Sequence, residues 1–440
     1  MTKSIAEIDD YFNAQMPNFA LGNLRDNRLD RMELLLSRLN HPEDSFTSYH
    51  IAGSKGKGTT ATYLSKIIDD NLGRCGLYMS PHVYDVRERF TNASRFFSDD
   101  IYMQTFDLML RMLEGFSIPE ELGAPSPTTF ELYTAYGYML FKESGCKYAV
   151  IETGLGGRLD ATNTLKDPKA VIFTEIEMEH TNVLGNTFEE IANEKLGIYR
   201  NNAKVFYYQD KLKPELDKRG IEANKISLDF SQIQGCNDIY RLKTNDGCNI
   251  LLSNASKASV MDSIFAYKIA KALSIITCRD DIDLSTVSLP ARFEKKKLKE
   301  KNILTILEGA HTKVSCISAL DSLKKLLGDS YASKETNDVT LIFSLADGKD
   351  SKSIIKEIFP SFDKVFITSL GKFKKSSPEK LQEEAIELFP NKSITLEMDA
   401  SKAIDEAISI THENGIIFVL GSFYLADEIN TALKDNGYVN

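Results

Sequence analysis

The sequence has no apolar run that approaches the roughly 18 residues a membrane-spanning helix requires. Its first residues, Met1-Thr2-Lys3-Ser4, lead into an acidic stretch, unlike a secretory signal. Its six cysteines are scattered without a CxxC pair, which argues against a zinc ribbon or a disulfide framework. We therefore expect a soluble, cytoplasmic protein with reduced thiols and no membrane partner.

An excess of basic residues is also missing. The 53 Lys and Arg residues are outnumbered by 63 Asp and Glu, so the formal net charge of −10 would repel a phosphate backbone. One short basic run, at Lys295–Lys297 with Lys299 and Lys301, has no interleaved aromatic side chain that could stack on bases. We expect this run to form a solvated face, and we expect no nucleic-acid partner.

Strand-like and helical patterns alternate from about Ser48, which is typical of βαβ units and a parallel sheet. The first strands are expected at Tyr49–Ala52, Leu77–Met79, Tyr148–Ile151 and Val171–Ile176. Residues 203–260 predict a second small sheet with strands at Val205–Tyr208 and Asn249–Leu252. A fresh alternation predicts strands at Ile303–Leu307, Val339–Phe343, Lys364–Ile367 and Ile416–Leu420. The sequence contains no internal repeat, and the alternation of strands and helices predicts an α/β fold.

The 440 residues exceed what one hydrophobic core usually organises, so we expect two domains. Pro290 and the charge run that follows it mark a junction near 294–300. We therefore predict a domain with a mostly parallel sheet at 1–294 and a smaller doubly wound α/β domain at 295–440.

A glycine-rich segment follows the first expected strand and opens a helix that runs to about Leu72. Such a segment lets backbone N–H groups and a helix N-terminus approach an anion, while a lysine reaches the outer phosphates and a hydroxyl binds Mg²⁺. The strict pattern GxxxxGK[ST] fails, because position 51 is Ile and position 58 is Gly, so a plain turn is the alternative. The expected phosphate contacts are Gly53, Ser54, Lys55, Gly56, Lys57, Gly58, Thr59 and Thr60.

Oxygen ligands for Mg²⁺ are expected near this loop. Glu152 ends an apolar strand, where the carboxyl ends of parallel strands present ligand-binding side chains. Mg²⁺ prefers oxygen ligands and usually keeps several waters, so Thr59, Glu152 and the nucleotide phosphates would suffice. His180 follows the expected strand Val171–Ile176, but a lone histidine in such a position is more often structural than a ligand.

Lys195 lies in an apolar stripe. Thr187 and Glu190 form a capping-box pattern that starts a helix, and Lys195 then shares one face with apolar residues at helical spacing. Burial lowers the pKa of an ammonium group, and a neutral amine can react with CO₂ to give a carbamate, an anion that could bind metal. The alternative is a lysine whose stem covers the helix while its charge reaches water.

Several segments resemble the folylpolyglutamate synthase and dihydrofolate synthase family of the Mur ligase superfamily. Gly53–Thr59 is similar to its GTNGKG[ST] loop, with Ser54 and Lys55 as departures. The further matches run from about 50 to 430: Ser80-Pro81-His82 with Glu88-Arg89, Thr129-Phe130-Glu131, Glu152–Asn163, His180-Thr181, Leu184-Gly185, Glu194–Ile198 and Gly421–Leu425. The resemblance implies a P-loop domain of the Mur ligase type, ATP and two Mg²⁺ ions, with Glu152 and His180 holding the second ion. It also implies a carbamylated Lys195 as a ligand of that ion.

The resemblance continues into the second domain with departures. Pro290-Ala291-Arg292-Phe293-Glu294 is similar to PGR(x)E, in which the arginine approaches the nucleotide. Ala291 replaces Gly and loses easy access to positive φ, so we expect a different backbone there. Residues 308–313 stand where the family has DGAHNP. Glu308 and His311 are expected as catalytic residues, and Glu308 also as a nucleotide contact, whereas Thr312 and Lys313 replace an amide and a proline.

The implied activity is an ATP-dependent amide ligation. The γ-phosphoryl group of ATP passes to a substrate carboxylate, Lys57 and Mg²⁺ stabilise the charge, and the amine of L-glutamate attacks the acyl phosphate in a closed cleft. The carboxylate substrate is a folate, or dihydropteroate in the dihydrofolate synthase reaction, and the patterns do not separate the two. Relatives are commonly monomeric, so we expect a monomer.

Three other functions remain to be weighed. A peptidoglycan Mur ligase is disfavoured, because no separate domain for a nucleotide sugar precedes residue 48. A P-loop motor or GTPase is disfavoured, because the sequence has no NKxD-like base-reading motif. A nucleotide- or folate-binding homologue that has lost ligation through its changed 308–313 segment stays open.

Overall fold

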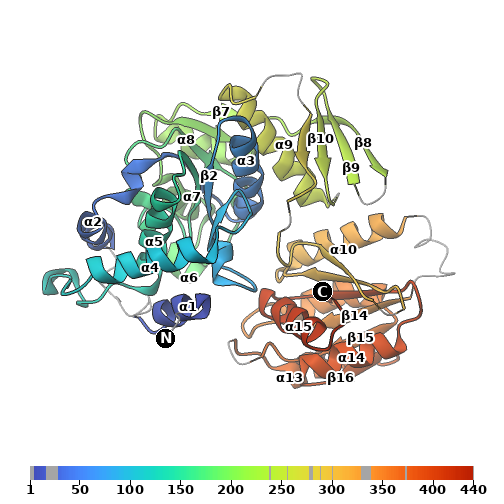
Figure 1. The fold of residues 1–440 in the computed structure, drawn as a ribbon. Coiled ribbons are helices and arrows are strands. Elements are labelled where there is room, and N and C mark those ends of the chain that lie inside the picture. The colour runs from blue at the N-terminus through green and yellow to red at the C-terminus, as the bar shows by residue number, and fades with distance from the viewer. Residues whose placement is uncertain are drawn as a thin grey trace. The chain divides into compact units, whose positions relative to one another are not determined.

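A computed structural model describes residues 4–15, 28–236, 239–254, 256–276, 281–287, 289–299, 301–328, 338–371 and 374–439. The chain divides into two compact units (Figure 1). The first unit consists of Met1–Ser253 with Ser259–Val287, and the second of Asn254–Ala258 with Ser288–Asn440. The division falls a few residues before the junction expected at 294/295, so Pro290–Glu294 belongs to the second unit.

The first unit is built on a seven-stranded sheet in the order β3-β2-β4-β1-β5-β6-β7. The strands are β1 (Thr47–Ala52), β2 (Cys75–Tyr78), β3 (Phe90–Asn92), β4 (Tyr148–Glu152), β5 (Ala170–Phe173), β6 (Lys204–Tyr207) and β7 (Asn224–Lys225). All neighbours are parallel except β2 and β3, which confirms the mostly parallel sheet. β1 lies between β4 and β5, with Ile51 opposite Glu152 and Ala52 opposite Phe173. The three carboxyl ends therefore meet at one edge, where such sheets bind ligands.

Helices cover both faces of this sheet in the first unit (Figure 1). They are α1 (Ile5–Asn13), α2 (Arg28–Arg38), α3 (Lys57–Asn71), α4 (Asp99–Met112), α5 (Thr129–Glu143), α6 (Thr181–Leu184), α7 (Phe188–Leu196), α8 (Lys213–Lys218) and α9 (Lys257–Ala272). The helices α1, α2, α4 and α5 share one core with β2 and β4, and α7 and α8 share another with β5 and β6. The helices α1 and α2, which precede β1, thus pack onto the core that β2 and β4 share. None of the helices within the described ranges is long and apolar enough to cross a bilayer.

A second, four-stranded sheet in the first unit has the order β11-β10-β9-β8. Its strands are β8 (Phe230–Cys236), β9 (Ile239–Thr244), β10 (Asn249–Leu252) and β11 (Ile282–Leu284). The expected strand at Asn249–Leu252 is confirmed. The assignment of Val205–Tyr208 to this small sheet is wrong, because β6 pairs with β5 in the large sheet. Its apolar residues identify a buried strand, but they cannot say which sheet that strand joins.

The second unit has a six-stranded sheet in the order β12-β13-β17-β14-β15-β16, parallel except for β12. The strands are β12 (Glu294–Lys297), β13 (Leu304–Glu308), β14 (Val339–Phe343), β15 (Lys364–Ile367), β16 (Ser393–Leu396) and β17 (Ile416–Leu420). The helices are α10 (Lys313–Leu327), α12 (Ser351–Ile358), α13 (Pro378–Leu388), α14 (Ala400–Ile410) and α15 (Phe423–Asp435). α10, α12 and α13 form one core with the sheet, whereas α14 packs against α15 outside it, so the unit is doubly wound. The lysine run forms the edge strand β12, a position where charge discourages further pairing.

Candidate functional site

The glycine-rich segment connects β1 to α3, as the sequence predicts. Gly56 is the N-cap of α3 with φ of 77°, and Lys57 begins the helix. A glycine N-cap has no side chain that could accept from the first N–H groups of the helix. The first turn of α3 also contains no acidic residue. Backbone donors and the positive end of the helix dipole therefore remain for an anion.

Two of these glycines are required by what packs on the loop. A Cβ on Gly53 would lie 1.9 Å from the Thr174 hydroxyl oxygen, and one on Gly56 would lie 2.6 Å from Asp262 Oδ1. Gly56 also needs its left-handed φ, which other residues reach at a cost. Asp262, a buried residue of α9, therefore places a carboxylate directly against the glycine-rich segment 53–60, hereafter the phosphate loop.

Ser54 and Lys55 attach the loop to the segment after β5. The Ser54 hydroxyl accepts from Glu177 N at 2.9 Å, and Lys55 Nζ lies 2.7 Å from a Glu177 carboxylate oxygen. Ser54 N and Lys55 N both donate to Glu175 O. The two departures from the family pattern thus fix the loop, and the charge of Lys55 is paired with Glu177.

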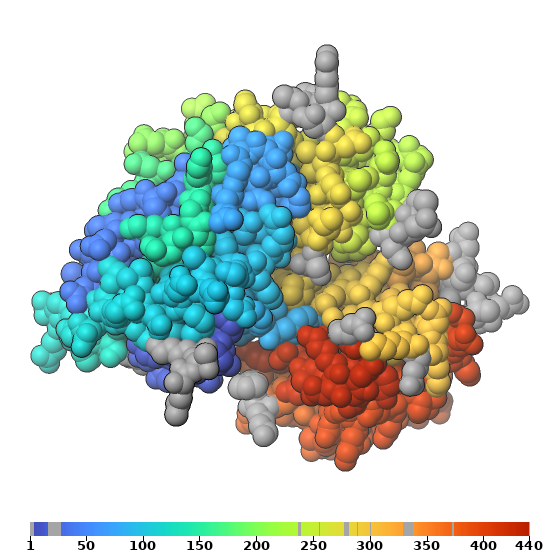
Figure 2. Space-filling model, viewed as in Figure 1, coloured from blue at the N-terminus to red at the C-terminus, as the bar shows by residue number. Residues whose placement is uncertain are grey.

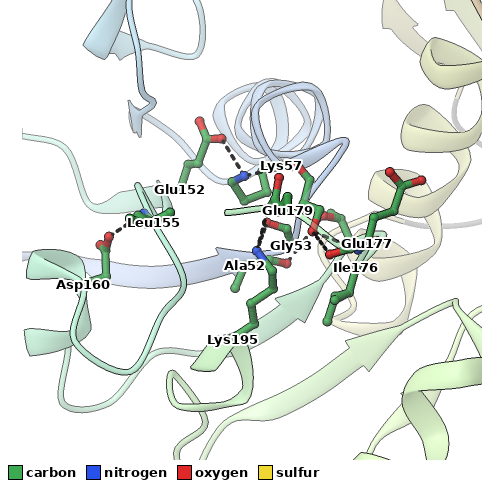
Figure 3. A network of polar contacts seen from close by, with 12 residues as sticks. Ala52, Gly53, Lys57, Glu152, Leu155, Asp160, Ile176, Glu177, Glu179 and Lys195 are labelled. Atoms are coloured by element: carbon green, nitrogen blue, oxygen red, sulfur yellow. Dashed lines mark hydrogen bonds and ion pairs between the residues drawn. The ribbon is translucent and has the colours of Figure 1, made fainter. Parts of the chain in front are cut away.

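Glu152 lies at the tip of β4 beside the phosphate loop. Its side chain is buried, Oε1 lies 3.9 Å from Lys57 Nζ, and Oε2 accepts from Ser80 N at 3.2 Å. Figure 3 shows this carboxylate turned toward Lys57. The structure therefore brings Lys57 and Glu152, which are both predicted site residues, close together.

Lys195 reaches the same loop from α7. Its side chain is 2% exposed, and Nζ donates to Gly53 O and to Glu179 Oε1, both at 2.8 Å (Figure 3). The capping box of Thr187 and Glu190 begins α7 as expected. Burial, with nearby Lys57 as a further cause, lowers the pKa of Lys195 to about 8, although Glu179 opposes the shift. An appreciable share of neutral amine near neutral pH follows. The surface alternative for Lys195 is wrong, because its charged end does not reach water.

Glu179 is a site residue that the sequence analysis misses. Burial raises its pKa, but Lys195 and Lys57 outweigh that effect, so the pKa of Glu179 lies below its usual range. The available signal is the alternation of Glu175, Glu177 and Glu179 after β5. His180, next in the chain, is the exposed N-cap of the short helix α6.

The donor chemistry of the site fits Mg²⁺. The Thr59 side chain lies in the first turn of α3 and is nearly buried, and Glu152 and Glu179 add carboxylates. Oxygen donors of this kind suit a hard cation that keeps several waters. Among the residues that the structure describes, Glu152, Glu179 and His180 do not bring three ligand atoms within 4.8 Å of one another. The side chain of Thr60, an expected phosphate contact, is fully buried.

The second unit holds another polar cluster at the end of β13. Glu308 accepts from Phe293 N and from Ala310 N, both at 2.9 Å. Burial raises the pKa of Glu308 to about 7, against the lowering effects of these amides and of Arg292. A carboxyl group with this pKa can hold or release a proton near neutral pH.

The ring of Phe423 connects the other two predicted residues of the second unit. The Arg292 guanidinium lies over it at 5.1 Å from the centroid, and the His311 ring meets it edge-on at 6.2 Å. His311 Nδ1 also lies 2.9 Å from Gly309 O. A Cβ on Gly309 would lie 2.3 Å from the Phe423 ring, so this glycine permits the close packing. The structure thus brings Arg292, Glu308 and His311 together within this unit.

The premise that alanine would lose access to positive φ at position 291 is wrong. Ala291 has φ of 50°, in the left-handed region that favours glycine. Gly309 N donates to Ala291 O and Ala291 N donates to Glu294 Oε2, and these contacts hold the strained residue. Thr312 and Lys313 have structural roles, since Thr312 caps α10 and Lys313 pairs with Glu357.

Comparison with known protein families gives two matches that follow the two units. Residues 51–258 match the Mur ligase middle domain, and residues 291–433 match the dihydrofolate synthetase C-terminal domain. The first match contains the phosphate loop, Glu152, His180 and Lys195. The second contains Arg292, Glu308, His311 and Phe423.

Similar proteins cover nearly the whole chain. A dihydrofolate synthetase of Saccharomyces cerevisiae is 25% identical over 91% of this chain and 96% of its own length. A dihydrofolate synthase/folylpolyglutamate synthase of Bacillus subtilis is 27% identical over 92% and 95%. Among solved structures, folylpolyglutamate synthase from Thermotoga maritima has a TM-score of 0.77 at 23% identity over 99% of this chain and 97% of its own. The Escherichia coli FolC protein, solved with DHPP and ADP, has a TM-score of 0.73 at 20% identity over 99% of each chain. These two structures establish the fold.

Proposed function

Because the chain belongs to the folylpolyglutamate synthase/dihydrofolate synthase family of the Mur ligase superfamily, we propose that it ligates L-glutamate to a folate-type carboxylate at the expense of ATP. One observation carries the proposal. The phosphate loop lies between two buried charged groups, Glu152 beside Lys57 and Lys195 on Gly53 O. A plain glycine-rich turn does not require this arrangement.

The phosphate loop binds the nucleotide. The N–H groups of the first turn of α3 face the phosphates, and Lys57 stabilises the charge that spreads over the transferring oxygens. Attack of the substrate carboxylate oxygen on the γ-phosphorus releases ADP and leaves an acyl phosphate. Attack of the glutamate amine on its carbonyl carbon then releases inorganic phosphate and forms the amide.

Thr59 and Glu152 would hold one Mg²⁺, and Glu152, His180 and Lys195 would hold the second. Bound there, Mg²⁺ supplies the positive charge that neutralises the phosphates. We assign Lys195 as a carbamate in the active enzyme. A buried amine with a pKa of about 8 has the reactive neutral form available, and carbamylation turns a cation into an oxygen ligand.

The second unit supplies the residues for the incoming amino acid. Arg292 offers a cation, and Glu308 and His311 offer a carboxyl group and an imidazole. Because Thr312 and Lys313 are used in capping α10 and in pairing with Glu357, their departure from the family pattern leaves Glu308 and His311 in place. This arrangement favours an active ligase over a homologue that binds nucleotide or folate without ligation.

The test is mass spectrometry of parallel reactions with ATP, Mg²⁺ and L-glutamate. One reaction contains dihydropteroate and the other tetrahydrofolate. A product that is heavier than the substrate by one glutamyl residue supports the proposal and identifies the carboxylate substrate. The match of residues 291–433 to a dihydrofolate synthetase domain favours product with dihydropteroate. ADP release without a glutamylated product in either reaction would contradict ligation and favour the binding homologue.

We further propose that the chain acts as a monomer in the cytoplasm. The support is the formal net charge of −10, which disfavours self-association, and the resemblance to a family whose members are commonly monomeric. Light scattering after size exclusion should give a mass near the 49.4 kDa of one chain. A mass near twice that value would contradict the monomer.

A further inference from the structure

The segment that follows β5 runs alongside the phosphate loop. Lys55 and Glu175 form an isolated antiparallel bridge, and both Ser54 N and Lys55 N donate to Glu175 O, at 2.6 and 3.1 Å. The Ser54 hydroxyl then accepts from Glu177 N at 2.9 Å. Backbone hydrogen bonds therefore attach the loop to this segment at two successive points.

The same segment is also held by a residue that follows β6. Ile176 is buried between Glu175 and Glu177, and its N–H donates to Gln209 Oε1 at 3.1 Å. Its carbonyl accepts from Gln209 Nε2 at 3.2 Å. Alternate residues of an extended chain point to opposite sides, so Glu175 and Glu177 contact the loop while Ile176 contacts Gln209. Glu179 is the next residue of the series that contacts the loop side.

The two lysines of the loop have different partners. Lys57 Nζ lies 3.9 Å from Glu152 Oε1 at the tip of β4. Lys55 Nζ lies 2.7 Å from Glu177 Oε2 in the segment after β5. Because β1 lies between β4 and β5, the two ammonium groups are directed to opposite sides of the loop. Figure 3 shows Glu152 and Glu177 on the two sides of Lys57.

The ion pair of Lys55 and Glu177 is more enclosed than a typical surface pair. The two side chains are 29% and 28% exposed, and the backbone N–H of each residue is already bonded across the same junction. An exposed pair contributes little, partly because two free side chains must be ordered to form it. Here the backbone of both residues is ordered before the side chains meet. The Lys55 ammonium can reach a phosphate only if this pair breaks.

We propose that Lys55 and Glu177 are a positioning pair, which holds the phosphate loop against the segment that carries Glu179, and that Lys55 does not itself contact the nucleotide. The inference rests on the proposed nucleotide site. Lys195 Nζ joins the same two parts a second time, because it donates to Gly53 O and to Glu179 Oε1. The distance between bound phosphates and the Glu179 carboxylate therefore depends on the pair.

The test measures binding of the non-hydrolysable ATP analogue AMPPCP, with Mg²⁺, to the full chain by calorimetry. Lys55→Met and Glu177→Gln each break the pair, so each should weaken binding about threefold to fivefold. The double variant should bind no more weakly than either single variant, because the contact can be lost only once. Lys55→Arg keeps a cation opposite Glu177 and should bind within about twofold of the wild type.

A second ion pair on α3 provides the matched control. Lys66 Nζ lies 2.5 Å from Asp70 Oδ2, and Figure 2 shows α3, in blue, at the surface of the first unit. Lys66→Met and Asp70→Asn should leave AMPPCP binding unchanged. In the ligation reaction, Lys55→Met and Glu177→Gln should raise the KM for ATP by the factor seen in binding. The KM for L-glutamate should stay the same, a separation that a general loss of stability does not produce.

A direct contact between Lys55 and phosphate predicts a different pattern. Lys55→Met would again weaken AMPPCP binding, but Glu177→Gln would free the ammonium group and strengthen it. Opposite signs for the two variants, or unchanged affinity in both, would overturn the positioning pair and leave the proposed function intact. Failure of the wild type to bind AMPPCP would overturn the proposed function and this inference together.

Discussion

The two polar clusters of this chain use buried charge in opposite ways. Beside the phosphate loop, Lys195 pairs with Glu179, but burial and the nearby charge of Lys57 lower the pKa of the lysine to about 8. In the second unit, Glu308 is held by two backbone amides, and its pKa rises to about 7. The comparison teaches that burial disfavours the charged form in both clusters, and that the sign of the group decides whether its pKa falls, as for Lys195, or rises, as for Glu308.

Removing Lys195 should have the largest effect. Lys195→Ala deletes the buried contact to Gly53 O and Glu179, and with it the proposed carbamate, so kcat should fall about 100-fold. A short added carboxylate should restore part of the activity. The control is Lys204→Ala, an exposed lysine at the start of β6. Full activity of Lys195→Ala without the additive would remove the ligand role from this residue.

The next effect concerns the pH dependence of stability. A carboxyl group whose folded pKa is about 7 and whose usual pKa is 4.5 holds its proton in the folded state across that window. The unfolding free energy of the wild type should therefore fall as pH rises from 5 to 8, by roughly 2 kcal/mol more than in Glu308→Gln. Urea unfolding at several pH values measures this difference. Parallel pH profiles for both proteins would contradict the raised pKa of Glu308.

A third prediction tests the negative charge of Asp262 beside the phosphate loop. The Asp262 carboxylate lies against Gly56, where it would repel nucleotide phosphates. Asp262→Asn keeps the shape and removes the charge, so the KM for ATP should fall about fivefold, which corresponds to about 1 kcal/mol. The KM for glutamate should stay the same. A higher KM for ATP would show that the carboxylate supports the loop.

The smallest expected effect concerns the backbone of the second unit. Ala291→Gly removes the steric strain of an alanine in the left-handed region, but glycine also makes the unfolded chain more flexible. The unfolding free energy should therefore rise by a net amount of about 0.5–1 kcal/mol. The matched control is Ala319→Gly within α10, which should lose about 1 kcal/mol. Chemical denaturation of both variants gives the comparison. Equal destabilisation by the two changes would mean that Ala291 is not strained.

Local patterns allowed the elements and much of the site to be predicted. Val339–Phe343, Lys364–Ile367, Ile416–Leu420 and Asn249–Leu252 are strands with the expected bounds. The phosphate loop and the capping box of α7 were predictable because each depends on neighbours within a few residues. The position of Lys195 in an apolar stripe correctly predicted its burial.

Tertiary structure alone decided which distant groups meet. Glu179 pairs with Lys195, and Asp262 packs on Gly56 from 206 residues away, and no local pattern encodes either contact. Packing and hydrogen bonds between segments likewise decided which sheet β6 joins and which backbone conformation Ala291 adopts. Sequence therefore determined the elements and the residue types at their ends. The fold determined how burial and neighbouring charges adjust the pKa of each group, because those depend on distances that only the folded chain sets.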